Sequence, residues 1–118
     1  MSDTIGTVSV LFGRIVPVFS VADAQAQKLT YLHQSCSANI SAKWDPSGQA
    51  NAALTLASGA DSAIMSMADA KACLAWVGQC VTACRTLESE IAAIVADSTK
   101  TDAQKVAGID AINWVSQS

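Results

Sequence analysis

Aromatic and charged residues are scarce in this chain of 118 residues. Only 5% of its residues are aromatic and 14% are charged, although 51% are hydrophobic. Alanine fills 22 of the hydrophobic positions, so small side chains rather than rings make the chain apolar. This balance excludes an intrinsically disordered chain, which needs low hydrophobicity and high net charge. Seven Lys and Arg residues are too few for a basic nucleic-acid surface, so we expect no nucleic-acid partner.

The chain also lacks a long uninterrupted hydrophobic run and the pattern of a secretion signal. A membrane-spanning helix needs about 20 predominantly apolar residues. The most apolar stretch, residues 5–26, is interrupted by Gly13, Arg14 and Pro17. A signal peptide has a positive charge before its apolar region, where this chain has Asp3. We therefore expect no membrane span and a soluble protein that is cytoplasmic where it is synthesised.

Catalytic motifs are absent as well. The sequence contains no glycine-rich phosphate loop, no G-x-S-x-G, no H-E-x-x-H and no Asp-rich calcium loop. His33 is the one histidine, the side chain that titrates near neutrality without perturbation. Asp23, Asp69 and Asp102 stand where helix starts are expected. We therefore predict no enzymatic activity, no cofactor and no small-molecule substrate.

Residues 7–19 differ in composition from the rest of the chain, because they are rich in β-branched and aromatic residues and contain no alanine. Gly13-Arg14 suits a two-residue turn between strands of about 7–12 and 15–19, and Pro17 confines the second strand to an edge. An extended arm is the alternative. A lone hairpin is marginal in water, so either form needs a partner surface. The predicted interface residues are Val8, Val10, Phe12, Ile15, Val16, Val18 and Phe19.

From residue 20 onward the signals are helical. Ser20, Ser66 and Thr101 each precede an acid or amide by three residues, a pattern typical of helix starts. The fold class we predict is mainly α, an antiparallel bundle of three or four alanine-rich helices over residues 20–118, with residues 1–19 as an N-terminal β-hairpin or extended arm. The whole is expected to form a single domain.

The expected helix limits follow from local signals. The first helix should run from about residue 20 to Lys43 or Trp44, because the residue before Pro46 avoids the α region. Pro46-Ser47-Gly48 is predicted as a turn, followed by a weaker helical segment over residues 49–58. The strongest helix covers residues 67–97, and the last one runs from residue 102 to about residue 116.

Apolar residues at steps of three and four predict which faces pack. In the first helix that face consists of Ala22, Ala26, Leu29, His33, Cys36, Ile40 and Trp44. In the weaker segment Ala50, Ala53, Leu54 and Ala57 keep the spacing. In the long helix the predicted face is Met67, Ala70, Leu74, Val77, Val81, Cys84, Glu88, Ile91 and Val95, widened by Cys73, Cys80, Leu87 and Ile94. Glu88 interrupts this stripe, either as a buried acid or at a solvated edge.

The four cysteines lack the spacing of a disulfide scaffold, so we expect reduced thiols. In an oxidising compartment, a disulfide from Cys36 to Cys80 or Cys84 is the alternative. His33 and Cys36 are three residues apart, and Cys80 and Cys84 are four apart. If the two faces meet, the four side chains form a candidate site for Zn²⁺ or Cu(I). The alternative is that these thiols simply pack the core, as buried cysteines commonly do.

An apolar surplus and an N-terminal segment that needs a partner together predict a non-enzymatic structural or assembly protein. It would act through protein–protein contacts as a homo-oligomer or within a larger assembly, for example as a small virion or phage component. One alternative is a thiol-based metal-binding (Zn or Cu) or redox helical-bundle protein. Another is a small inhibitor or docking module that binds a larger machine.

Overall fold

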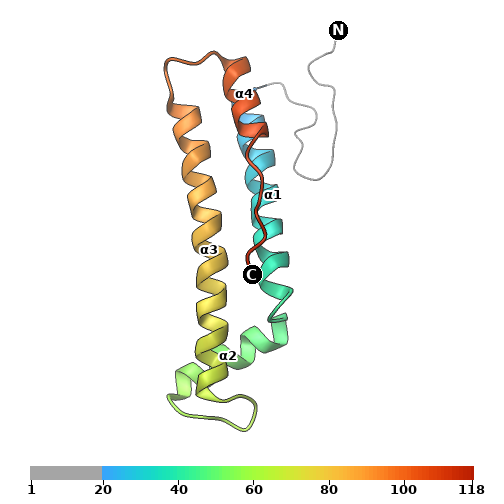
Figure 1. The fold of residues 1–118 in the computed structure, drawn as a ribbon, viewed down its shortest axis with the longest axis vertical. Helices are drawn as coiled ribbons and strands as arrows, with labels where there is room; N and C mark the ends of the chain where they lie inside the picture. Colours follow the sequence, from blue (N-terminus) through green and yellow to red (C-terminus); the bar gives the residue numbers. More distant parts are fainter. Residues whose placement is uncertain (1–19) are drawn as a thin grey trace. The chain divides into compact units, whose positions relative to one another are not determined.

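The computed structural model describes residues 20–118, in which all regular secondary structure is helical (Figure 1). The helices are α1 (Val21–Ser41), α2 (Pro46–Ser58), α3 (Met67–Ala96) and α4 (Asp102–Asp110). The prediction of a mainly α protein is thereby confirmed. The predicted hairpin or arm over residues 7–19, with its interface residues, lies outside the described residues.

The described chain divides into two compact units, and both long helices contribute to each. Unit 1 contains residues 20–35 and Cys84–Val115, that is, most of α1, the last part of α3, and α4. Unit 2 contains Cys36–Ala83 and Ser116–Ser118, that is, the end of α1, all of α2 and the first part of α3. Within unit 1, α1 and α3 run in opposite directions (Figure 1).

Three of the helix starts follow the predicted capping pattern. The hydroxyl oxygens of Ser20, Ser66 and Thr101 each accept a hydrogen bond from the backbone N–H three residues further on, at 3.0, 3.1 and 3.2 Å. At α4 the backbone N–H of Thr101 also donates to Gln104 Oε1 at 2.9 Å, which completes a capping box. Each cap satisfies a backbone donor that the helix cannot, which is worth about 1 kcal/mol.

Helix α2 begins earlier than the sequence pattern suggests. Residues 46–48, predicted as a turn, are its first turn, and that prediction is wrong. Asp45 is extended and its Oδ1 accepts a hydrogen bond from the Gly48 N–H at 2.7 Å. Pro46 suits the first helical position because its fixed φ is helical and no N–H is needed there. Gly59, at φ 78°, ends the helix in the left-handed conformation.

Helix α4 is shorter than predicted, because it ends at Asp110 rather than near residue 116. Residues 112–118 continue without regular structure, and side chains of α1 bind their backbone. Within unit 1 the N–H of Trp114 donates to the Tyr31 hydroxyl at 3.1 Å. Within unit 2 the Asn39 side chain accepts from the Gln117 N–H at 2.6 Å and donates to the Gln117 carbonyl at 3.3 Å. These contacts replace the backbone hydrogen bonds that a longer helix would make.

The buried face of α1 differs in phase from the predicted one. Its buried residues are Ala24, Lys28, Leu32 and Cys36, whereas the predicted face members Ala22, Ala26 and His33 are exposed. The spacing of apolar residues did not predict this face, because Lys28 occupies its second buried position and a lysine is not counted as apolar.

The buried face of α3 lies on the side of its cysteines. Its buried residues are Ala70, Cys73, Trp76, Cys80, Cys84 and Ile91. Leu74, predicted to pack, is 58% exposed. Trp76 was not part of the predicted stripe, but its ring is buried and its Nε1–H donates to the Ile40 carbonyl at the end of α1, at 3.1 Å. This hydrogen bond, made within unit 2, favours the observed rotation of the helix.

Lys28 is fully buried and links α1 to the end of α4 in unit 1. Its Nζ donates to the carbonyl oxygens of Ile112 and Asp110, at 2.7 and 3.1 Å. It also lies 5.0 Å from the centre of the Tyr31 ring. The last carbonyls of a helix have no partner within the helix and carry partial negative charge. The ammonium group therefore satisfies the main chain where α4 stops.

We predict that Lys28→Met lowers the free energy of unfolding by about 2–4 kcal/mol, because Met fills similar space but leaves one buried and one partly buried carbonyl group without this donor. Urea unfolding followed by circular dichroism measures the effect. Lys71→Met is the matched control, since Lys71 is exposed on α3. Equal unfolding free energies for the two variants would show that the buried ammonium contributes no net stability.

Candidate functional site

The four cysteines are buried, and none of them forms a disulfide bond. Of the predicted ligand set, His33 and Cys84 belong to unit 1, and Cys36 and Cys80 belong to unit 2. Within unit 2, Cys36 is near enough to Cys80 to raise the pKa of the Cys80 thiol, in addition to the larger effect of burial. Cys73 lies in an apolar cluster with Ala52 and Ala70, and burial raises its pKa. For Cys73 the interpretation as a core residue is therefore sufficient.

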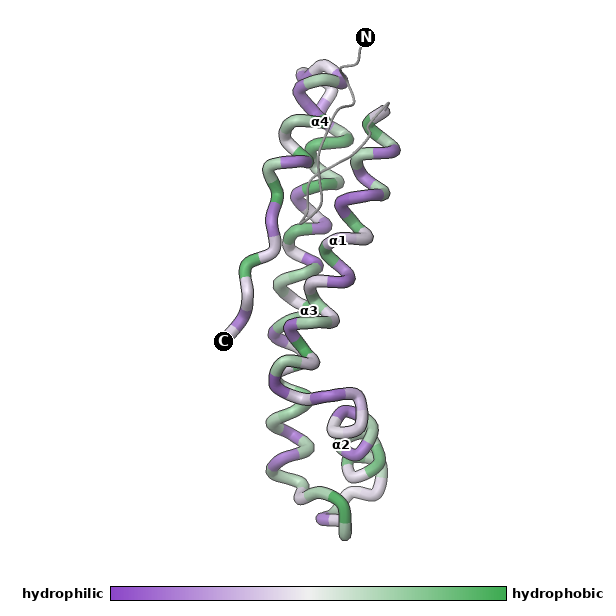
Figure 2. Tube along the Cα trace, turned by 90° about the vertical axis from the view of Figure 1, so that its right-hand side faces the viewer, coloured by the Kyte–Doolittle hydropathy of each residue, from purple (hydrophilic) through white to green (hydrophobic). Residues whose placement is uncertain are grey.

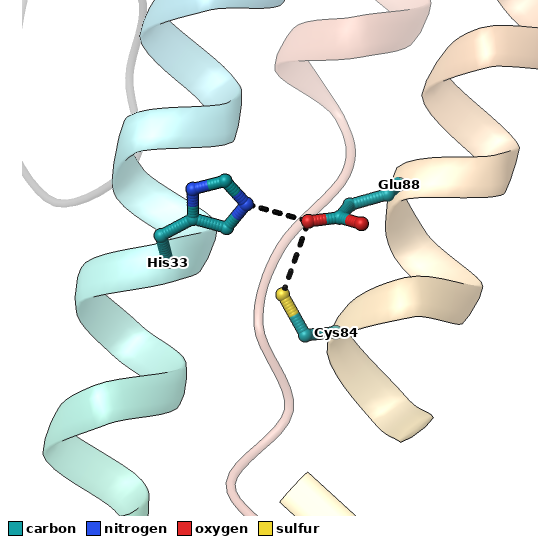
Figure 3. A group of neighbouring side chains, drawn as sticks. All are labelled: His33, Cys84 and Glu88. Carbon is teal, nitrogen blue, oxygen red and sulfur yellow. Dashed lines mark hydrogen bonds and ion pairs between the residues drawn. The ribbon is translucent and has the colours of Figure 1, made fainter. Parts of the chain in front are cut away.

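In unit 1 His33 and Cys84 meet a third chemically active side chain, Glu88 (Figure 3). His33 Nε2 lies 2.5 Å from Glu88 Oε2, and Cys84 Sγ lies 3.6 Å from the same oxygen. One ligand atom from each of the three residues lies within 4.8 Å of the other two. We call these residues the His–Cys–Glu cluster.

Helix geometry explains how the cluster forms. Cys84 and Glu88 are one helical turn apart on α3, so their side chains project from the same side. His33 reaches them from α1, directly after the fully buried Leu32. Cys84 is buried, whereas the side chains of His33 and Glu88 are 60% and 33% exposed. The cluster therefore extends from the interior of unit 1 to its surface, where a small solute has access.

The order of the three groups argues against nucleophilic catalysis. A cysteine nucleophile needs a histidine within hydrogen-bond reach, with a carboxylate behind the histidine to orient it. Here the carboxylate oxygen lies between the sulfur and the imidazole. A carboxylate is a weak base for a thiol, because the ordinary pKa of a carboxyl group is about 4 units lower than that of a thiol. Nitrogen, sulfur and oxygen donors side by side instead resemble a set of metal ligands.

Sequence reasoning found two members of the cluster and assigned the third no ligand role. The sequence allows Glu88 to be a buried acid or to lie at a solvated edge; in the structure it is half-buried and paired with His33. The sequence does contain a signal for its position beside Cys84. An acid four residues after a cysteine, on a stripe that is otherwise apolar, places a carboxylate beside a thiol.

A second candidate site is the outer face of α2 in unit 2. Ala50, Ala53, Leu54 and Ala57, which keep helical spacing, are exposed, and Leu54 is 63% exposed. The opposite side of the helix is buried through Ala52 and Thr55. Figure 2 shows hydrophobic stretches in α2 and in the loop that follows it. We call the four exposed residues the α2 stripe.

A buried hydroxyl explains why α2 turns its apolar stripe outward. Thr55 is fully buried, and its Oγ1 forms a hydrogen bond with Ser62 Oγ at 2.8 Å. The Thr55–Ser62 bond holds the loop against the helix, and Ser62 Oγ also accepts from the Met65 N–H at 3.2 Å within the loop. A buried hydroxyl without a partner is costly. The partner in the loop therefore favours the helix rotation that buries Thr55 and exposes Leu54.

Comparison with protein-family models, with curated proteins and with solved structures gives no match for this chain. In the part of the chain that the structure describes, no helix is both long and apolar enough to span a membrane.

We predict that stability falls as the pH rises above about 9 and that Cys80 contributes to the fall. Burial and the neighbouring Cys36 raise the pKa of Cys80 above its ordinary value of 9.0. The folded state thus holds a proton that the unfolded state releases, so folding is favoured below pH 9 and weakened above it. Each such group contributes up to about 1.4 kcal/mol per pH unit.

Denaturant unfolding between pH 7 and 10.5 measures this slope. Cys80→Ala should give a shallower decline than the unaltered protein, while any cavity it creates lowers stability at every pH alike. Parallel curves for the two proteins would contradict the predicted role of this thiol.

Proposed function

We propose that this protein is a non-enzymatic assembly subunit, and that its α2 stripe is covered by residues 7–19 of a second copy of the chain. The observation that carries the proposal is the orientation of α2. This helix presents its most regular apolar face to solvent and a threonine to the interior. In an isolated chain this orientation leaves apolar surface in contact with water, which is unfavourable. The same surface becomes buried when a partner covers it.

The chemistry of the α2 stripe suits a close apolar contact. The 13 residues of α2 include no charged side chain, so no charge would lose its hydration in an interface. Alanine at three of the four stripe positions allows a partner backbone to approach closely. Leu54 supplies a larger apolar side chain whose burial by a partner is favourable. Ile64 and Leu74, also in unit 2, are 52% and 58% exposed and add apolar surface.

Residues 7–19 have the matching composition. They include eight large apolar residues and one charged residue, Arg14. As a hairpin or an extended arm this segment needs an apolar surface to cover it, and the α2 stripe needs an apolar cover. Covering both removes two unfavourable exposures in one contact. A small virion or phage component, and a docking module on a larger machine, are protein classes that use such contacts.

The test is the oligomeric state of the full-length protein, measured by native mass spectrometry over a range of concentrations. We expect a discrete oligomer. We expect Leu54→Glu to raise its dissociation constant by about tenfold or more, since a carboxylate would be buried against apolar side chains. Leu54 is largely exposed, so the variant should keep the helix content of the parent protein. Ala93→Glu, at an exposed position of α3, is the matched control and should leave the oligomer intact.

Val16→Glu in the N-terminal segment tests the occupant of the stripe. If residues 7–19 cover the stripe, this variant dissociates the oligomer as Leu54→Glu does. Dissociation by Leu54→Glu alone would show that another part of the second copy covers the stripe. A protein that stays monomeric at all concentrations would overturn the proposal.

A further inference from the structure

The His–Cys–Glu cluster combines three donor types from two helices of unit 1. Two of its members, Cys84 and Glu88, are spaced by one turn on α3, and His33 faces them from α1 (Figure 3). This ligand set differs from the one predicted from the sequence, because Glu88 takes part and the two cysteines of unit 2 do not. An exposed His–Glu pair adds little stability by itself, so stability alone does not account for this grouping of three donor side chains.

The distances within the cluster suit a small tetrahedral ion. Zinc bonds of about 2.0–2.3 Å place the ligand atoms roughly 3.3–3.8 Å apart. The Cys84 Sγ to Glu88 Oε2 distance, 3.6 Å, already lies in this range. The His33 nitrogen lies 2.5 Å from the Glu88 oxygen, so it would move outward by about an ångström. A side chain that is 60% exposed has room for that shift.

The donor types select among metals. Ca²⁺ and Mg²⁺ prefer oxygen ligands alone, and Cu(I) prefers soft sulfur ligands. One thiolate, one imidazole and one carboxylate suit Zn²⁺, whose sites draw on all three donor types. The thiolate and the carboxylate carry two negative charges, which balance a divalent ion.

We propose that His33, Cys84 and Glu88 bind one divalent transition-metal ion of the zinc type. On binding, the Cys84 thiol releases its proton to solvent as the sulfur–metal bond forms, and neutral His33 donates through a ring nitrogen. Three protein ligands leave a fourth position for water. The ion links α1 to α3 within unit 1, so the folded form gains stability by mass action. This proposal is independent of the assembly proposal, which rests on unit 2.

The experiment is titration of the full-length, reduced, chelator-treated protein with Co²⁺ as a spectroscopic probe, followed by displacement with Zn²⁺. We expect one Co²⁺ per chain, with a thiolate-to-cobalt charge-transfer band and the visible bands of tetrahedral Co²⁺. Glu88→Gln should raise the dissociation constant for Co²⁺ by about tenfold or more, because an amide is a poorer ligand than a carboxylate. Cys84→Ser should abolish the charge-transfer band.

Two control variants separate this site from its alternatives. Glu90→Gln alters an exposed acid on the same helix and should leave binding unchanged. Cys80→Ala removes a thiol of unit 2 and should keep the charge-transfer band. His33→Gln, at an exposed position, supplies a second ligand variant if Cys84→Ser does not fold. Failure to bind near one equivalent of Co²⁺, or a band that survives Cys84→Ser and is lost in Cys80→Ala, would overturn the proposal.

Discussion

The buried ammonium group of Lys28 is the interaction on which the arrangement of unit 1 depends. It satisfies carbonyl groups at the end of α4 that the helix itself leaves without donors. Burying a lysine is favourable only when such acceptors are in place. The same contact sets the rotation of α1, because Leu32 must then lie one turn further along the buried face. His33, the next residue, is thereby turned toward the surface where it meets Glu88.

Hydrogen bonds from side chains to backbone recur in both units and compensate for small apolar residues. An alanine side chain buries little area, so alanine-rich faces distinguish poorly between one helix rotation and the next. A directional hydrogen bond distinguishes them well. Trp76 to the Ile40 carbonyl, Asn39 to the Gln117 backbone and Lys105 to the Val95 carbonyl are further examples. Each joins a side chain of one segment to the main chain of another.

In each unit a directional hydrogen bond of a buried side chain sets the rotation of one helix, and each proposal follows from one such rotation. In unit 2 the Thr55–Ser62 hydrogen bond decides which side of α2 is buried, and an apolar stripe is left outside. In unit 1 the rotation of α1 brings an imidazole to a thiol and a carboxylate on α3. The first arrangement suits contact with another copy of the chain, and the second suits a metal ion. Neither requires the other.

Local sequence determined where the helices start, because Ser20, Ser66, Thr101 and Asp45 act on backbone groups three residues away. It also determined the extent of α3, whose long run contains no proline. Tertiary structure alone decided the rotation of α1, the end of α4 and the contact between His33 and Glu88. Those features depend on Lys28, which bonds residues 82 and 84 positions away, and on His33, which meets a carboxylate 55 positions away. Periodicity classes a lysine as an outward residue, whereas acceptors supplied by a distant segment make its burial favourable.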